Sequence, residues 1–385
     1  MSPDSSTSRS NAMSAEPSTD RERSADRGVD PESPTEVLTD PSDDTTILPP
    51  LPREASDGAP RARDLTSSPT VADTIFRRDA FSAGGITVAI MLAVGLFLAL
   101  RAGQAILPPD GAGLSFLTTQ AWSPETGDFG IAAVLFGTVT IAIIAMSVSV
   151  PLALGTSLLI SEVLRGRLKQ WAITLVDLMA AVPSVVYGLW GVFFLQEAII
   201  PVSRWISTYF AWIPVFAVTD ADGNALTDAS AFTSSAFIAG VVVALMVVPT
   251  QTSIMREAFM QAPAGEREAA YALGSTRWGM IVAVVLPFGR GGIIGGTMLG
   301  LGRALGETIA VYMIISPIFF INWQVLKTGG NSVSALIALR YGEASEFGLS
   351  ALMAAGLVLF LITLVVNFTA SSIVSRSRSG AESEA

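Results

Sequence analysis

The sequence of 385 residues contains no cysteine and no histidine. Without cysteine the chain has no disulfide and no thiolate nucleophile, and without histidine it lacks the commonest general base and a common zinc ligand. These two absences exclude zinc sites and the mechanisms of most enzyme classes.

Lysine is almost as scarce, since only Lys169 and Lys327 occur. Neither residue follows a Gly-x-x-x-x-Gly run, so the chain has no phosphate-binding loop of the kind found in ATP-hydrolysing proteins. If ATP drives this protein, a separate chain must bind the ATP and its Mg²⁺. We therefore expect no catalytic residue, no metal site and no cofactor here.

Charged residues make up only 15% of the sequence, whereas 50% is hydrophobic. This balance is typical of a polytopic membrane protein, and a helix needs about 20 apolar residues to cross a bilayer. Stretches of that length occur at 82–103, 130–160, 171–197, 232–252, 290–318 and 349–373. The sequence therefore predicts an all-α fold with six transmembrane helices, of which the second and third contain Pro151 and Pro183.

The first 78 residues differ from the rest of the chain. They are rich in Ser, Thr, Pro, Asp and Arg, and they carry much of the acidity behind the net charge of -10, for example in the stretch "DPSDD". Such a segment cannot bury enough apolar surface to offset its ordering entropy. We expect residues 1–78 to form a disordered cytoplasmic tail, as a solvated extension rather than a regulatory element.

Basic residues between the predicted spans indicate the orientation of the chain. They precede the first span, follow the second and sixth, and lie between the fourth and fifth, whereas the loops 104–129 and 199–231 are mainly acidic. All the basic clusters fall on one side if both termini are cytoplasmic. The chain is thus predicted to be a multi-pass protein with its N- and C-termini inside.

The cytoplasmic segment 253–288 is longer than a turn between two helices requires. Its part "GEREAAYALG" is rich in good helix formers, and Gly274 suits the left-handed backbone that often follows a helix. One interpretation is an amphipathic helix on the membrane surface. The other is a coupling helix that docks into a groove of a soluble partner, with Ala269 and Ala270 allowing close approach and Glu268 as a polar anchor.

The stretch "EAAYALGSTRWGMIVAVVLP" resembles the motif of ABC importer permeases, in which Glu-Ala-Ala is followed by Gly after three residues and by Ile-x-Leu-Pro after nine more. The positions that fit are Glu268, Ala269, Ala270, Gly274, Leu286 and Pro287, with Val284 in the Ile position. The resemblance implies the type I ABC importer permease fold. It favours the coupling helix, in contact with an ATPase, over the surface helix.

Four other stretches are similar to the phosphate-specific branch of these permeases, and to its PstC-type subunit in particular. They are "FLTTQAWSPETGDFGIAAVLFGT", "VPLALGTSLLISE", "AAVPSVVYGLWGVFFL" and "GLGRALGETIAV". The resemblance covers the chain from about residue 80 onward. It implies a bacterial cell-membrane importer of inorganic phosphate, in which a PstS-type binding protein outside delivers the ion to this chain and a PstA-type second permease. Two copies of a PstB-type ATPase would bind ATP and Mg²⁺, and no nucleic acid is implied.

Arg303 and Glu307 lie inside the fifth predicted span, where an arginine costs about 2.5 to 3.5 kcal/mol on insertion scales. At 100° per residue they share one helix face with Gly292, Gly296 and Gly300, and a glycine stripe lets another helix approach closely. This face is therefore predicted to point into the bundle or toward a partner permease. A purely structural ion pair between the two charges is one interpretation.

The alternative is that Arg303 assists phosphate through the pore, because a guanidinium matches phosphate oxygens with two parallel hydrogen bonds. Glu307 would hold Arg303 in the empty path and would accept the proton of hydrogen phosphate, which sulfate lacks. Three other functions stay open at this point: import of another oxyanion such as sulfate, secondary anion transport with the charged pair as a relay, and a membrane sensor.

Overall fold

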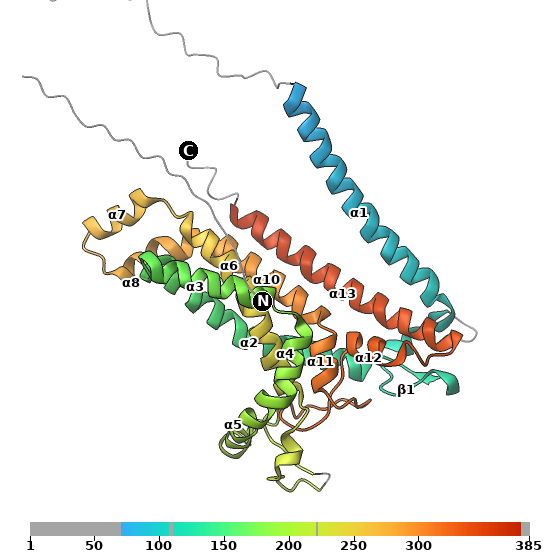
Figure 1. Cartoon of the computed structure of the whole chain (residues 1–385). Helices are drawn as coiled ribbons and strands as arrows, with labels where there is room; N and C mark the ends of the chain where they lie inside the picture. Colours follow the sequence, from blue (N-terminus) through green and yellow to red (C-terminus); the bar gives the residue numbers. More distant parts are fainter. Residues whose placement is uncertain (1–70, 108–110, 221, 379–385) are drawn as a thin grey trace, which may run out of the picture. The chain divides into compact units, whose positions relative to one another are not determined.

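A computed structural model describes residues 71–107, 111–220 and 222–378, which lie within one compact unit, Pro69–Ala385. The regular structure of these residues is almost entirely helical (Figure 1). The predicted tail lies outside the described ranges except for its last eight residues. Those eight are helical, because α1 (Val71–Ile106) begins at Val71.

Within the described ranges five helical segments are long and apolar enough to cross a membrane, and a bent pair of helices brings the number to six if the pair is counted as one span. The five are α1, α2 (Ala132–Leu158) with the π-helical turn Leu159–Val163, the continuous segment Ser184–Tyr209, α6 (Ala236–Met260) and α13 (Glu346–Arg378). The segment Ser184–Tyr209 comprises α4 (Ser184–Trp190), a π-helical turn (Gly191–Leu195) and α5 (Gln196–Tyr209). The prediction of an all-α polytopic fold is confirmed.

Helix α6 is the centre of the bundle. Of the 18 most apolar consecutive residues of α6, 61% are buried within the chain. The corresponding share for α1 is 0%, so the apolar side chains of α1 face outward. Helix α6 packs against α2, against α10 (Arg290–Gly306) and against α3 (Gly166–Ala181). Helix α1 instead packs along α13. The central helix carries two fully buried polar side chains, Gln251 and Thr252.

The third predicted span, 171–197, is not one helix. Helix α3 ends at Ala181, Val182 is extended, and a new helix begins after Pro183. The reason is steric, because a proline disfavours the helical conformation of the residue before it. With 16 residues α3 is too short to cross the bilayer, and the segment here that is long and apolar enough to cross is Ser184–Tyr209.

The fifth predicted span, 290–318, is also wrong in its bounds. Helix α10 ends at Gly306, Glu307 is extended, and α11 (Ile309–Ile314) follows as a separate short helix. At its other end α10 joins the segment Arg277–Phe288 at an angle of 67°, and the two together pass the length and hydropathy test for a span. Glycine at 306 and a carboxylate that caps the next helix explain the break.

The remaining regular elements are short. They are α7 (Ala264–Ala272), α8 (Arg277–Met280), a π-helical turn (Ile281–Val285), α9 (Leu286–Phe288) and α12 (Val333–Arg340), the 3-10 turns Gly113–Leu117, Pro124–Thr126 and Ala229–Phe232, and the antiparallel strands β1 (Trp122–Ser123) and β2 (Asp128–Phe129). The predicted cytoplasmic segment 253–288 is thus shorter than expected, because α6 continues to Met260.

The glycine face of α10 lies against α6, as predicted for a helix that packs inside the bundle. A Cβ atom at Gly292 would overlap Ala258, and one at Gly300 would overlap the Gln251 side chain. A Cβ at Gly296 would lie 3.3 Å from Met255. Close approach of the two helices therefore depends on the missing side chains.

We expect Gly292→Ala to destabilise the protein by about 1 to 3 kcal/mol, because the added methyl group pushes α10 away from α6. The matched control is Gly295→Ala on the same helix, where no atom lies within 4 Å of the added Cβ. That variant should be neutral or more stable by up to about 1 kcal/mol, since alanine is the better helix former. Thermal unfolding in detergent measures both, and equal stabilities of the two variants would contradict this packing.

Candidate functional site

Arg303 lies in the last turn of α10, three residues before the helix ends at Gly306, and its side chain is half-buried. Its Nη1 donates a hydrogen bond of 3.2 Å to the Thr250 hydroxyl on α6. Together with α13, these helices border an open hollow of about 660 Å³. The polar groups of its lining are Thr250, Arg303, Thr363 and Asn367.

No carboxylate pairs with Arg303 in the described part of the chain, where the one ion pair joins Arg267 to Glu162. A charged side chain within a spanning helix normally faces a partner or a water-filled cavity, because its burial in hydrocarbon is costly. Arg303 has only a neutral hydroxyl as hydrogen-bond partner among the described residues. The site therefore has an uncompensated positive charge at the wall of a hollow, which suits an anion.

Glu307 is turned away from the predicted pairing with Arg303. Its Oε1 accepts a hydrogen bond of 3.2 Å from the backbone N–H of Ala310, and its backbone oxygen accepts one of 2.6 Å from the Ser334 hydroxyl. The predicted ion pair four residues apart is wrong, because α10 ends at Gly306 and the helical spacing no longer applies. The carboxylate instead caps the first turn of α11.

Three polar side chains of the hollow, Thr250, Thr363 and Asn367, were not predicted as site residues. Thr363 and Asn367 lie four residues apart on α13, and therefore on one face of that helix. The amide oxygen of Asn367 lies 3.5 Å from where a Cβ on Gly302 would be. Polar residues within apolar spans were the signal that marks such positions.

The coupling segment has the predicted helix and the predicted helix end. Helix α7 covers Ala264–Ala272, and Gly274 follows with a φ of 82°, in the left-handed region. Glu268, Ala269 and Gly274 are exposed, and so is Pro287. These residues are free to contact another protein, and their role in docking an ATPase stays a prediction.

The other two motif residues hold the coupling segment to the bundle. Ala270 and Leu286 pack against a buried cluster that includes Phe259, Met280 and Val285. The motif therefore combines two tasks in this fold. Part of it presents a surface, and part of it fixes that surface to α6 and to the helix that leads into α10.

An ion pair that the sequence did not predict ties α7 to the π-helical turn that follows α2. Arg267 Nη1 lies 3.1 Å from Glu162 Oε2, and the Arg267 guanidinium also donates to the backbone oxygen of Phe259. The side chain of Glu162 is 4% exposed and that of Arg267 is 22% exposed. Because the pair is largely shielded from water, it depends on both partners being present.

Residues 149–379 match the family described as the binding-protein-dependent transport system inner membrane component. The phosphate transport system permease protein PstC of Xylella fastidiosa (strain 9a5c) is 34% identical over 317 residues, which are 82% of this chain and 93% of that protein. The phosphate transport system permease protein PstC 2 of Mycobacterium tuberculosis is 34% identical over 312 residues, 80% of this chain and 93% of that protein. A solved bacterial ABC transporter involved in the import of the acidic polysaccharide alginate aligns with a TM-score of 0.49 and 16% identity, covering 79% of this chain and 98% of that one.

Proposed function

The chain belongs to the family of binding-protein-dependent transport system inner membrane components, and from that premise we propose that it is a permease subunit of an ATP-driven importer of inorganic phosphate. It is a multi-pass membrane protein and not itself an enzyme. The relatives named above are phosphate transport permeases, and they support phosphate as the cargo.

The observation that carries the proposal is the uncompensated Arg303 beside the hollow. Its Nη1 donates to the Thr250 hydroxyl, which leaves the N–H groups of Nε and Nη2 for a ligand. A guanidinium binds a phosphate with two parallel, charge-assisted hydrogen bonds. Helix α13 brings Asn367 to the same hollow, so an amide group adds a neutral donor and acceptor.

Glu307 does not line the hollow but directly follows its lining residue Gly306, and we infer that it gives the proposed path a basis for distinguishing phosphate from sulfate. Its Oε1 is used by the Ala310 N–H, and in the described ranges no hydrogen bond occupies Oε2. A carboxylate oxygen accepts a hydrogen from hydrogen phosphate but gains nothing from fully ionised sulfate. The alternative is import of another oxyanion such as sulfate.

The partners follow from the type of importer. We infer a PstA-type second permease, two copies of a PstB-type ATPase that bind ATP and Mg²⁺, and a PstS-type extracellular phosphate-binding protein. The exposed face of α7 is the proposed ATPase contact, with Glu268 and Ala269 on it. Basic residues around this end support cytoplasmic termini in a bacterial cell membrane.

The test is phosphate uptake by proteoliposomes that contain the chain together with its partner subunits. Phosphate should enter only when ATP is supplied on the ATPase side and the binding protein on the other. A secondary transporter would instead move phosphate down an ion gradient without ATP, and that result would overturn the proposal.

A charge reversal on α7 tests the ATPase contact. We expect Glu268→Lys to lower the amount of ATPase that co-purifies with the chain about tenfold, because a polar anchor worth about 1.4 kcal/mol is replaced by an opposite charge. Glu266→Lys is the matched control, since Glu266 is exposed on the same helix but lies outside the motif. Equal ATPase recovery with both variants would contradict the assignment of Glu268.

A further inference from the structure

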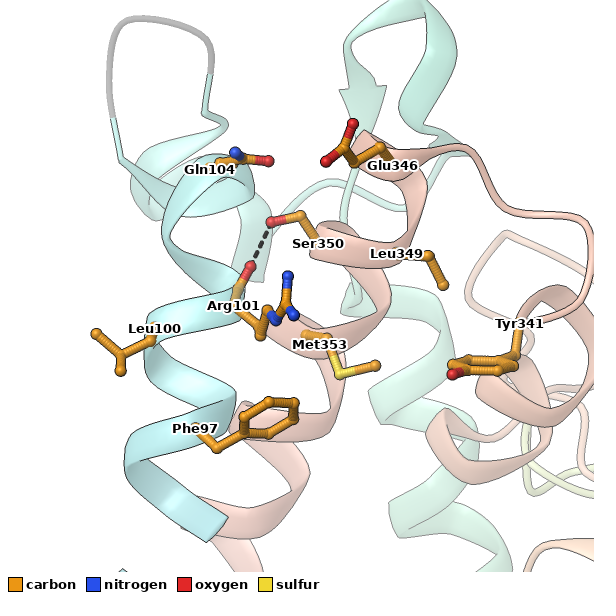
Figure 2. Close-up of a pocket in the computed structure, with 9 residues that line it drawn as sticks. All are labelled: Phe97, Leu100, Arg101, Gln104, Tyr341, Glu346, Leu349, Ser350 and Met353. Atoms are coloured by element: carbon orange, nitrogen blue, oxygen red, sulfur yellow. Dashed lines mark hydrogen bonds between the residues drawn. The ribbon is translucent and has the colours of Figure 1, made fainter. Parts of the chain in front are cut away.

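A pocket of about 300 Å³ lies where the C-terminal part of α1 meets the N-terminal end of α13 (Figure 2). It is separate from the hollow at Arg303, and its lining comes from α1, α13 and Tyr341 just after α12. Ser350 on α13 holds the two long helices together here, because its hydroxyl donates to the backbone oxygen of Arg101. The pocket is thus a wedge between two helices that are apolar over most of their length.

Two opposite charges line this pocket without pairing. Arg101 and Glu346 are both exposed, and neither takes part in an ion pair within the described ranges. The Arg101 guanidinium lies over the ring of Phe97, whose centroid is 5.8 Å away. An arginine near the end of a spanning helix is costly unless its head group reaches the membrane surface or an anion.

The lining changes from polar to apolar along the helices. Figure 2 shows Gln104 and Glu346 at one end of the pocket, Arg101 in the middle, and Phe97 at the other end, with Met353 beside Arg101. Phe97 lies toward the apolar middle of α1, and Glu346 is the first residue of α13. A ligand that fits this gradient has a charged head with both signs and a hydrocarbon tail.

We propose that this pocket binds a zwitterionic phospholipid of the phosphatidylethanolamine class. Its phosphate contacts the Arg101 guanidinium, its ammonium group contacts the Glu346 carboxylate, and an acyl chain lies along Phe97 and Met353. Arginine binds phosphate oxygens bidentately, and a carboxylate accepts from an ammonium group. The lipid fills the wedge between α1 and α13, and since α1 packs chiefly along α13, it helps to hold α1 in place.

The chemistry of the lipid is argued from this pocket alone. Its position in the outer leaflet rests on the proposed function, because cytoplasmic termini place the C-terminal end of α1 on the outer side of the membrane. The lipid's presence is measured without transport, so failure of the two proposals can be told apart. A chain that imports phosphate but retains no lipid would contradict only the lipid site.

The proposal is tested by native mass spectrometry of the full chain with its partner subunits. Lipid is added to the complex in detergent, and the complex is then released from the detergent in the spectrometer. Phosphatidylethanolamine adducts should fall about tenfold in Arg101→Gln and in Glu346→Gln, because each variant loses one charge-assisted contact. Phosphatidylglycerol has no ammonium group, so its weaker binding should fall in Arg101→Gln but not in Glu346→Gln. Arg204→Gln and Glu197→Gln are the controls, since both residues are exposed on α5, away from the pocket, and they should change neither lipid.

Equal retention of phosphatidylethanolamine by the wild type and both pocket variants would overturn the proposal. A direct ion pair between Arg101 and Glu346 would also overturn it. Such a pair would show as lower thermal stability of each single variant in lipid-free detergent, with wild-type stability restored in the double variant Arg101→Glu/Glu346→Arg. Displacement of the lipid by millimolar inorganic phosphate would also overturn it, because the site would then take the free anion.

Discussion

Arg303→Gln should lower phosphate uptake at least about 100-fold in a complex that assembles normally. Two charge-assisted hydrogen bonds from a guanidinium to phosphate are each worth about 1.5 to 3 kcal/mol, so their loss exceeds the 2.7 kcal/mol that corresponds to a factor of 100. Glutamine keeps a polar side chain at this position, but it ends two bonds short of Nη1 and therefore also loses the hydrogen bond to the Thr250 hydroxyl. The measurement is the initial rate of labelled phosphate uptake.

Two further variants separate charge from geometry. Arg303→Lys keeps the positive charge but loses the planar fork, so we expect intermediate uptake. Arg290→Gln is the matched control, because Arg290 is an exposed arginine at the first position of the same helix. Near-normal uptake by Arg303→Gln would contradict a direct role of this residue and would leave it as a structural group.

Arg267→Met should destabilise the coupling segment by about 3 to 5 kcal/mol. Removing the guanidinium leaves the Glu162 carboxylate, which is 4% exposed, without its counter-ion. It also removes the donor to the backbone oxygen of Phe259. Because α7 is tied to the π-helical turn that follows α2 through this pair, the variant should lose both thermal stability and uptake driven by ATP. Thermal unfolding and ATP-dependent uptake measure the two effects.

The double variant Arg267→Met/Glu162→Leu decides whether the buried charge is the cause. Replacing both partners by apolar groups is often nearly neutral, so stability should return close to that of the wild type. Arg277→Met is the control, since Arg277 is exposed at the start of α8 and has no ion pair in the part of the chain that the structure describes. A double variant as unstable as Arg267→Met would contradict the explanation.

The apolar spans were predictable because hydrocarbon demands a long run of apolar residues whatever the rest of the fold. The stretches 82–103, 130–160, 232–252 and 349–373 correspond to α1, α2 with its π-helical end, α6 and α13, although α2 begins two residues later than predicted and α6 four residues later. Gly274 was predictable for a local reason, because its left-handed backbone is set by the helix end that it follows. The inward face of α10 followed from the spacing of its glycines.

The breaks in the third and fifth spans were not predictable from hydropathy, because apolar residues continue on both sides of Pro183 and of Gly306. The second break separates Arg303 from Glu307 and removes the ion pair that a continuous helix implied. Contacts of the site were hidden for another reason. Thr250 lies 53 residues from Arg303, and Glu162 lies 105 residues from Arg267, so packing of distant segments brings each pair together.

We propose that this chain is the permease of a phosphate importer, with Arg303 and Glu307 on the translocation path. This claim is tested most directly by uptake of labelled phosphate in a strain that lacks the chain, before and after its restoration, with sulfate in large excess as the competitor. We predict that uptake returns with the chain and that sulfate does not reduce it. Restored uptake that sulfate abolishes, or no restoration by a chain shown to assemble in the membrane, would contradict the claim.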